Sequence, residues 1–258
     1  MRKILLASSL ALILSTVANA MPLLKIEGGV GVIPENISGS FGYKNTAVDV
    51  KDTLNLDGET SFYGWAKIEH PIPLIPNFKI EAHPTKFEGS GEVTQTFTFG
   101  DQTFSASSPI KTELQLNQYD LTAYWGVPFL GLLSLGTLGL LDLEVHFGLN
   151  LKYIDGYAMV EIEGTDTKED TNFSIPLPMA CGEVGVKVGP VKTEVEAKWI
   201  GYSGNQFLDA TGKVTYSPFP LTFIGVGYKY QNIKIDDISD IYSDIKIKGP
   251  FVEAGLRF

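Results

Sequence analysis

The sequence predicts an all-β fold, a closed antiparallel up-and-down transmembrane β-barrel, and three observations support this class. Apolar residues alternate with charged and polar ones over Leu141–Tyr153. A period of two is that of a strand, and this segment exceeds the typical globular strand of about five or six residues. A tilted membrane-spanning strand needs about nine to eleven. In addition, an export signal begins the chain, and a second alternating segment ends it at Phe258.

The N-terminus predicts a cleavable signal peptide. Two basic residues come first, an apolar stretch follows over Ile4–Leu14, and the A-x-A sequence Ala18–Ala20 ends the segment. This order is typical of a secretory signal peptide, and the apolar stretch is short for a membrane anchor. We therefore expect residues 1–20 to be removed and residues 21–258 to form one barrel domain.

The composition narrows the possible function classes. The formal net charge of −10 becomes −12 once the two basic residues of the signal peptide are lost. An acidic chain without a basic cluster is not expected to bind nucleic acid. Cys181 is the single cysteine, so an intrachain disulfide is impossible, and a small packing role is expected for it. The sequence has no continuous apolar run of about 18 residues, which argues against a helical membrane protein.

Ten segments are predicted as strands, with eight or twelve as alternative totals. The clearest besides 141–153 are 24–32 and 191–203, in which apolar residues again alternate with Lys and Glu or with Gly. Weaker alternation marks 59–70, 77–90, 109–125, 173–187, 206–217, 221–235 and 245–258. The alternation changes phase by one residue near Gln118 and Gly182, which predicts a β-bulge at each position.

The connections predict an up-and-down order with both termini at the periplasmic end. Short or proline-marked turns at 71–76, 189–190 and 217–220 alternate with longer polar loops. The expected loops are 34–58, 164–172 and 236–244, with Ser203–Asn205 as a short member. Short turns at one end and longer loops at the other are typical of transmembrane barrels. The apolar, Gly-rich segment Val127–Leu140 is expected at a periplasmic turn, either at the membrane interface or capping the barrel.

The terminal segment resembles the closing strand of bacterial outer-membrane β-barrels. Phe258, Leu256, Ala254 and Val252 share one face, and Arg257 belongs to the other. The resemblance implies the outer membrane of a Gram-negative bacterium and a terminal strand that the barrel insertion machinery recognises as its signal. It also directs the apolar faces of the strands toward lipid.

The first mature strand carries a second resemblance. Lys25–Val32 contains the pair Gly28-Gly29 and, with Leu256-Arg257-Phe258, resembles a family of outer-membrane proteins that have a Gly-Gly pair in the first strand. The resemblance implies a barrel of modest size without an assigned activity. A physical reason for Gly29 and Gly31 is space, because they remove side chains from one strip of the lumen.

With the apolar faces outward, the charged faces line the lumen. The predicted lumen residues are Lys25, Glu27, Lys67, Glu69, Lys79, Glu81, Glu144, His146, Lys152, Glu183, Lys187, Glu194, Glu196, Lys198 and Arg257. A barrel of this size is filled by its side chains, and opposite charges in a narrow space of low dielectric constant should pair. The sequence leaves two readings open, a closed plug of ion pairs and a narrow path for ions or water.

No catalytic or cofactor site is predicted. His70 and His83 flank a proline turn, His146 faces the lumen, and no G-x-S-x-G elbow is present, so an enzyme is not expected. The acidic loops, which hold Asp236, Asp237, Asp240 and Asp244 and Glu163, Asp166, Glu169 and Asp170, do not match a calcium loop, and no metal site is assigned. Bridging of these loops by divalent ions to lipopolysaccharide phosphates is an alternative.

We therefore expect an outer-membrane barrel with a structural or surface-interaction role. Its partners would be outer-membrane lipids, lipopolysaccharide and the barrel insertion machinery. The alternatives are a narrow-pore channel or transporter of a small apolar solute, and a soluble periplasmic barrel that binds a ligand.

Overall fold

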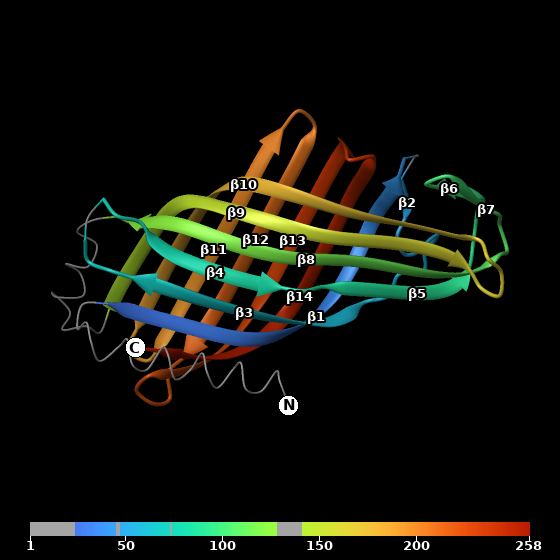
Figure 1. Cartoon of the computed structure of the whole chain (residues 1–258). Helices are drawn as coiled ribbons and strands as arrows, with labels where there is room; N and C mark the ends of the chain where they lie inside the picture. Colours follow the sequence, from blue (N-terminus) through green and yellow to red (C-terminus); the bar gives the residue numbers. More distant parts are fainter. Residues whose placement is uncertain (1–23, 45–46, 73, 128–140) are drawn as a thin grey trace.

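The computed structural model describes residues 24–44, 47–72, 74–127 and 141–258, which form an all-β, closed antiparallel barrel of ten strands (Figure 1). In order around the wall the strands are β1 (Lys25–Tyr43), β3 (Glu59–Glu69), β4 (Asn77–His83) continued by β5 (Lys86–Glu92), β8 (Pro109–Gly126), β9 (Leu141–Ile162), β10 (Lys168–Val188), β11 (Val191–Tyr202), β12 (Asn205–Tyr216), β13 (Thr222–Ile238) and β14 (Ile241–Arg257). β14 pairs with β1, so no strand edge is left free to face lipid.

The ten predicted segments each fall on one wall strand, so the predicted fold class and strand number are confirmed. The predicted signal peptide and most of the apolar segment 127–140 lie outside the described residues. Within the ranges that the structure describes, no helix is long and apolar enough to cross a membrane. We call the end at which β1 begins and β14 finishes the terminal end, and the opposite end the distal end (Figure 1).

The predicted distal loops are wrong in extent, because much of their length is strand. β1 continues to Tyr43 through the expected loop 34–58, and β10 already begins at Lys168. β13 and β14 extend almost to the turn between Ile238 and Ile241, where the loop 236–244 was expected.

The two predicted bulges are also wrong, and a change of polarity replaces them. β9 keeps one register against β8 through Gln118 and one against β10 through Gly182. In the terminal half of β9, Leu151 faces outward and Lys152 inward, whereas farther along Ile154 faces inward and Asp155 outward. The two faces of the strand therefore exchange polarity without a slip of the register. One half of the wall faces lipid and the other half faces water. We call the level at which the faces exchange polarity the polarity crossover.

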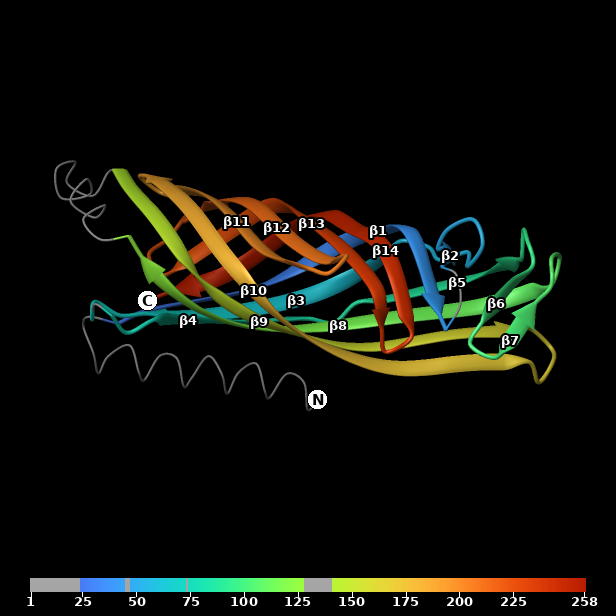
Figure 2. The same ribbon diagram turned by 90° about the horizontal axis from the view of Figure 1, so that it is seen from above.

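Beyond the crossover the barrel encloses a hydrophobic core. The hairpin of β6 (Phe97–Phe99) and β7 (Gln102–Phe104) and the segment 47–58, which includes β2 (Val48–Asp49), close the distal end (Figure 2). Fully buried members of this core include Ile37, Val50, Phe87, Phe99, Phe104, Ile110, Ile154, Phe207 and Ile241. Apolar residues from segments that were predicted as loops or bulges thus fill the inside of the distal half.

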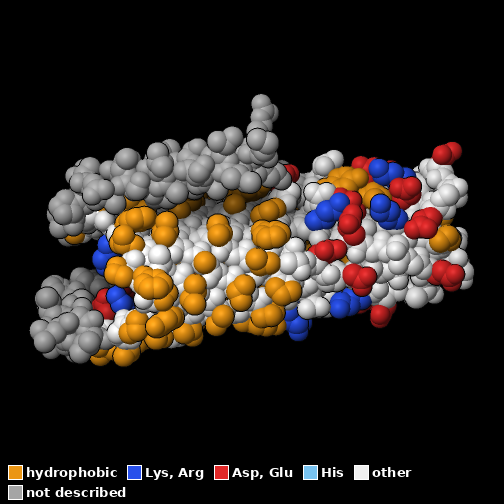
Figure 3. Space-filling view, turned by 90° about the horizontal axis from the view of Figure 1, so that it is seen from below, with side chains coloured by type: hydrophobic (Ala, Val, Ile, Leu, Met, Phe, Trp, Pro, Cys, Tyr) orange, Lys and Arg blue, Asp and Glu red, His pale blue; other side chains and the backbone are white. Residues whose placement is uncertain are grey.

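The exterior of the terminal half is an apolar belt. Val30, Leu149, Val195, Val226 and Val252 are each more than half exposed there, and charged side chains gather instead on the distal half (Figure 3). Apolar side chains at alternate positions around a closed wall are what lipid requires. The terminal half is therefore the membrane-spanning half.

Candidate functional site

The lumen of the membrane-spanning half is filled with charged side chains. Among the predicted residues, most take part in ion pairs there: Glu27, Lys67, Glu69, Lys79, Glu81, Glu144, His146, Lys152, Glu183, Glu194, Glu196, Lys198 and Arg257. Lys25 and Lys187 occupy inward register positions near the terminal end, and no carboxylate of the described residues lies within 4.0 Å of either. The structure thus brings most of the predicted charges together.

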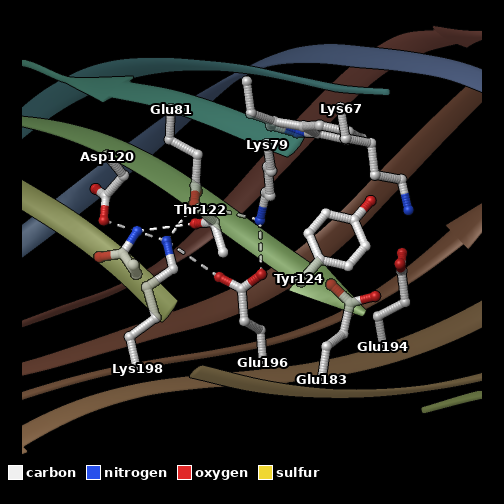
Figure 4. A network of polar contacts seen from close by, with 12 residues as sticks. Lys67, Lys79, Glu81, Asp120, Thr122, Tyr124, Glu183, Glu194, Glu196 and Lys198 are labelled. Carbon is white, nitrogen blue, oxygen red and sulfur yellow. Dashed lines mark hydrogen bonds and ion pairs between the residues drawn. The ribbon is translucent and has the colours of Figure 1, made fainter. Parts of the chain in front are cut away.

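A balanced set of four lysines and four carboxylates forms the central network, part of which Figure 4 shows. Its members are Lys79, Glu81, Asp120, Lys152, Glu196, Lys198, Asp209 and Lys229. They come from β4, β8, β9, β11, β12 and β13, so the network joins opposite walls of the barrel.

Lys198 is the centre of one part of this network. Its side chain is 1% exposed and contacts Glu81, Glu196 at 3.2 Å and Asp120 at 3.4 Å. Lys79 lies 2.7 Å from the same Glu196. A buried ammonium group left without a partner is strongly destabilising. The pairing is therefore what makes this number of charges tolerable inside the lumen.

Glu253 on β14 is the centre of a second cluster toward the terminal end. Tyr63 Oη donates to Glu253 Oε2 at 2.8 Å, Trp65 Nε1 donates to the same oxygen at 3.0 Å, and Lys213 Nζ lies 3.0 Å from Oε1. Lys213 also lies 4.3 Å from the centroid of the Trp65 ring, a cation–π contact. The carboxylate of Glu253 on β14 thereby contacts side chains of β3 and of β12.

The glycines of the first strand make room for these aromatic side chains. A Cβ atom at Gly29 would lie 2.9 Å from Trp65 Nε1, and one at Gly31 would clash with the Tyr63 ring. The predicted free strip is therefore present, and Trp65 and Tyr63 occupy it.

A third group lies at the terminal rim. Arg257 Nε donates to Glu27 at 2.6 Å, and Lys67 lies 3.4 Å from both Glu27 and Glu69. Tyr124 Oη donates to Glu69 at 3.1 Å. These contacts link β1, β3, β8 and β14 on the terminal side of the central network.

Several lumen charges were not predicted from the sequence. They are Glu35, Asp120, Lys192, Asp209, Lys213, Lys229 and Glu253. Lys192 and Glu253 stand on the polar faces of strands that were recognised, so alternation alone could have found them. Asp120 and Asp209 lie close to the polarity crossover, where the alternation in the sequence becomes ambiguous.

Glu35 and His83 mark the level at which the polar lumen ends. Ser61 Oγ donates to Glu35 Oε2 at 2.7 Å, Thr85 Oγ1 donates to it at 3.3 Å, and His83 Nε2 lies 3.4 Å away. The residue types are those of a hydrolase triad, but Glu35 lies between Ser61 and His83 and both side chains of the Glu35–His83 pair are buried. A triad needs the histidine next to the serine, so this arrangement does not activate Ser61.

A small free space lies in the lumen among the described residues. A cavity of about 40 Å³ lies between Trp65, Lys79, Lys213, Phe251 and Glu253. One buried water needs about 10–15 Å³ by the same measure, so this space suits a few water molecules. It is too small for an apolar ligand of ordinary size.

Comparison with known proteins identifies the fold. No protein-family model and no curated protein sequence matches the chain. The outer-membrane protease OmpT from Escherichia coli is 9% identical over 91% of this chain and 96% of its own, with a TM-score of 0.50. Ail of Yersinia pestis, solved with the heparin analogue sucrose octasulfate, is 10% identical over 92% and 99%, with a TM-score of 0.38.

The translocator domain of the autotransporter NalP from Neisseria meningitidis is 14% identical over 100% of this chain and 97% of its own, with a TM-score of 0.38. At 9% identity, OmpT supports the fold alone, that of an outer-membrane β-barrel. The resemblance to a family with a Gly-Gly pair in its first strand stays a prediction.

Proposed function

We propose that this protein is a sealed outer-membrane barrel of a Gram-negative bacterium, with a structural or surface-interaction role carried by its distal half. The observation that supports this most is the central network, in which four lysines and four carboxylates pair across the lumen. In this proposal the terminal end is periplasmic and the distal end extracellular.

Two physically different barriers support a closed lumen. An ion entering the membrane-spanning half would have to separate pairs such as Lys152–Asp120, whose atoms are 2.7 Å apart and almost completely buried. Beyond the crossover the same ion would meet the apolar core around Phe99 and Phe104. Burying an unpaired charge among apolar side chains is costly. Either barrier alone opposes conduction.

The distal half supports the surface role. β5, β8, β9 and β10 extend beyond the apolar belt, and the β6–β7 hairpin connects β5 to β8 there. The outer surface of this half bears mixed charges (Figures 2 and 3). A packed apolar core lies beneath this surface. We infer that it meets lipopolysaccharide or a partner outside the cell, and that the chain is not an enzyme.

The alternative functions have less support. The cavity of about 40 Å³ is small for a channel or for transport of an apolar solute. A soluble periplasmic barrel would place its apolar faces inside, whereas Leu149 and Val195 are more than half exposed on the outside of this one.

Conductance in planar bilayers tests the sealed barrel. We expect the refolded protein to show no steady current, and we expect the same after Phe104→Ala, because the central network remains. Steady conductance levels in the unaltered protein would overturn the proposal in favour of the narrow pore. Cell fractionation tests the location, and recovery of the protein as a soluble periplasmic species contradicts the membrane barrel.

A further inference from the structure

Three lumen residues lie together outside the central network. Among the residues that the structure describes, Glu144 and His146 of β9 and Glu183 of β10 form one group in which a ligand atom from each lies within 4.8 Å of the others. We propose that Glu144, His146 and Glu183 bind a divalent transition-metal ion of the Zn²⁺ type. The proposal concerns the interior of the barrel and does not depend on the role assigned to the distal surface.

Strand geometry explains why the three side chains converge. Glu144 and His146 are two residues apart on one strand and so share its inward face. Glu183 is the direct cross-strand neighbour of His146, and such pairs have Cβ atoms about 4.5–5.5 Å apart. Two positions on one strand and one on the next form a triangle of donors on a rigid wall. A site built on strands is held more precisely than one built on a loop.

The charges within the group fit a divalent cation. Glu183 has no lysine or arginine within 4.0 Å among the described residues, and its ion-pair partner is His146, with Nδ1 3.1 Å from Oε1. By contrast, each carboxylate of the central network contacts a lysine. Two carboxylates and a neutral imidazole match the charge of one divalent ion. Imidazole together with carboxylate suits zinc and its neighbours in the first transition row.

Glu144 shares its ion-pair partner with a second carboxylate. Lys192 Nζ lies 2.7 Å from Glu144 Oε2. Lys192 also lies 2.9 Å from Glu194. If Glu144 turns toward a metal ion, Lys192 therefore keeps a carboxylate partner, and the exchange leaves no ammonium group unpaired.

Two glycines on the neighbouring strands lie beside the group. Gly126 is paired with His146, and a Cβ atom there would lie 3.4 Å from the imidazole Cδ2. Gly185 is paired with Glu144, and a Cβ atom there would lie 3.5 Å from Glu144 Oε2. The ring of Tyr124 meets the imidazole edge-on at 5.1 Å and restrains its orientation. A small cavity of about 10 Å³ borders His146 and Glu183, and a water molecule there would complete the four ligands that zinc prefers.

Calorimetry on the refolded, chelator-treated full-length protein tests the site with zinc chloride. We expect saturable binding of about one ion per chain and a higher unfolding temperature with zinc, because an ion that binds only the folded state stabilises it. His146→Gln and Glu183→Gln should each weaken binding at least tenfold. His70→Gln is the matched control, since His70 lies in the turn after β3, where Nε2 is 3.1 Å from the carbonyl oxygen of Pro76, and it should bind as the unaltered protein does.

Absence of saturable binding, or equal binding by His146→Gln and the unaltered protein, would overturn the proposal. Zinc-edge X-ray absorption of the unaltered, zinc-loaded protein keeps the test decisive if either lumen variant fails to refold. One imidazole and oxygen ligands are expected. A spectrum without imidazole scattering contradicts the site.

Discussion

Lys152 on β9 and Asp209 on β12 meet inside the barrel with Nζ 3.1 Å from Oδ2, although two strands of the wall separate them. Both side chains are at most 2% exposed. Lys152 also contacts Asp120 at 2.7 Å, and Asp209 contacts Lys229 at 3.2 Å. The contact therefore links pairs that would otherwise be local to neighbouring strands, and it connects them within the central network.

Removal of the charge of Asp209 should destabilise the barrel strongly. Asp209→Asn leaves Lys229 without an ion-pair partner among the described residues, and breaking a buried pair costs about 3–5 kcal/mol. Urea unfolding in lipid vesicles, followed by tryptophan fluorescence, measures the change. Asp155→Asn is the control, because Asp155 is exposed on the outer face of β9, the strand that carries Lys152. A loss no larger than that of the control would show that the network contributes little to stability.

The space beside β1 should not tolerate a larger residue. Gly31→Ala places a methyl group against the Tyr63 ring, and overpacking of this kind costs about 1–3 kcal/mol. Gly212→Ala serves as the control, since no atom lies within 4 Å of its added Cβ. The same unfolding assay compares the two. Equal stability of both variants would mean that Tyr63 moves aside at no cost, contrary to the packing seen here.

The position of the polarity crossover predicts how lysine is tolerated on the outer wall. Val195→Lys, in the apolar belt, should cost about 2–4 kcal/mol, the range for a lysine near the bilayer midplane. Ser174→Lys, on the exposed distal face of β10, should change stability by no more than about 0.5 kcal/mol. Stability in vesicles measures both. A cost at Ser174 equal to that at Val195 would move the lipid boundary beyond the crossover.

The cap formed by β6 and β7 should loosen when its anchor is removed. Phe104 is fully buried, and Phe→Ala in a core costs about 3–5 kcal/mol. Limited proteolysis of the folded protein should therefore cut residues 93–107 faster in Phe104→Ala than in Gln102→Ala, whose side chain is exposed. Equal cleavage rates would indicate that the cap does not depend on this side chain.

Much of the fold could be predicted because alternation depends only on local sequence. Leu141–Tyr153 shows its inward and outward faces without any knowledge of its neighbours. The distal strand ends could not be predicted in this way, because Gln118 and Gly182 lie where the polarity of the two faces is exchanged. A change from lipid to water and a slip of register both change the phase of the alternation in the sequence. Only the observed pairing of β9 with β8 and β10 shows which of the two has occurred.

The inward direction of the lumen charges follows from the same alternation, but their partners do not. Lys198 reaches Glu81 and Asp120 on strands that are distant in the sequence, and this depends on closure and register of the whole barrel. The group of Glu144, His146 and Glu183 was missed for the same reason. Its third member becomes a neighbour only through the pairing of Glu183 with His146.

The polarity crossover fixes the immersion depth of the molecule. Two residues along a strand correspond to about 6.6 Å, so a modest shift into the bilayer would bring Asp155 into the hydrocarbon, and a shift outward would expose Leu151 to water. On β9, movement in either direction therefore raises the free energy. We therefore expect the barrel to occupy one depth in the membrane. Its distal end should then lie at a constant height above the lipid, whatever that end contacts.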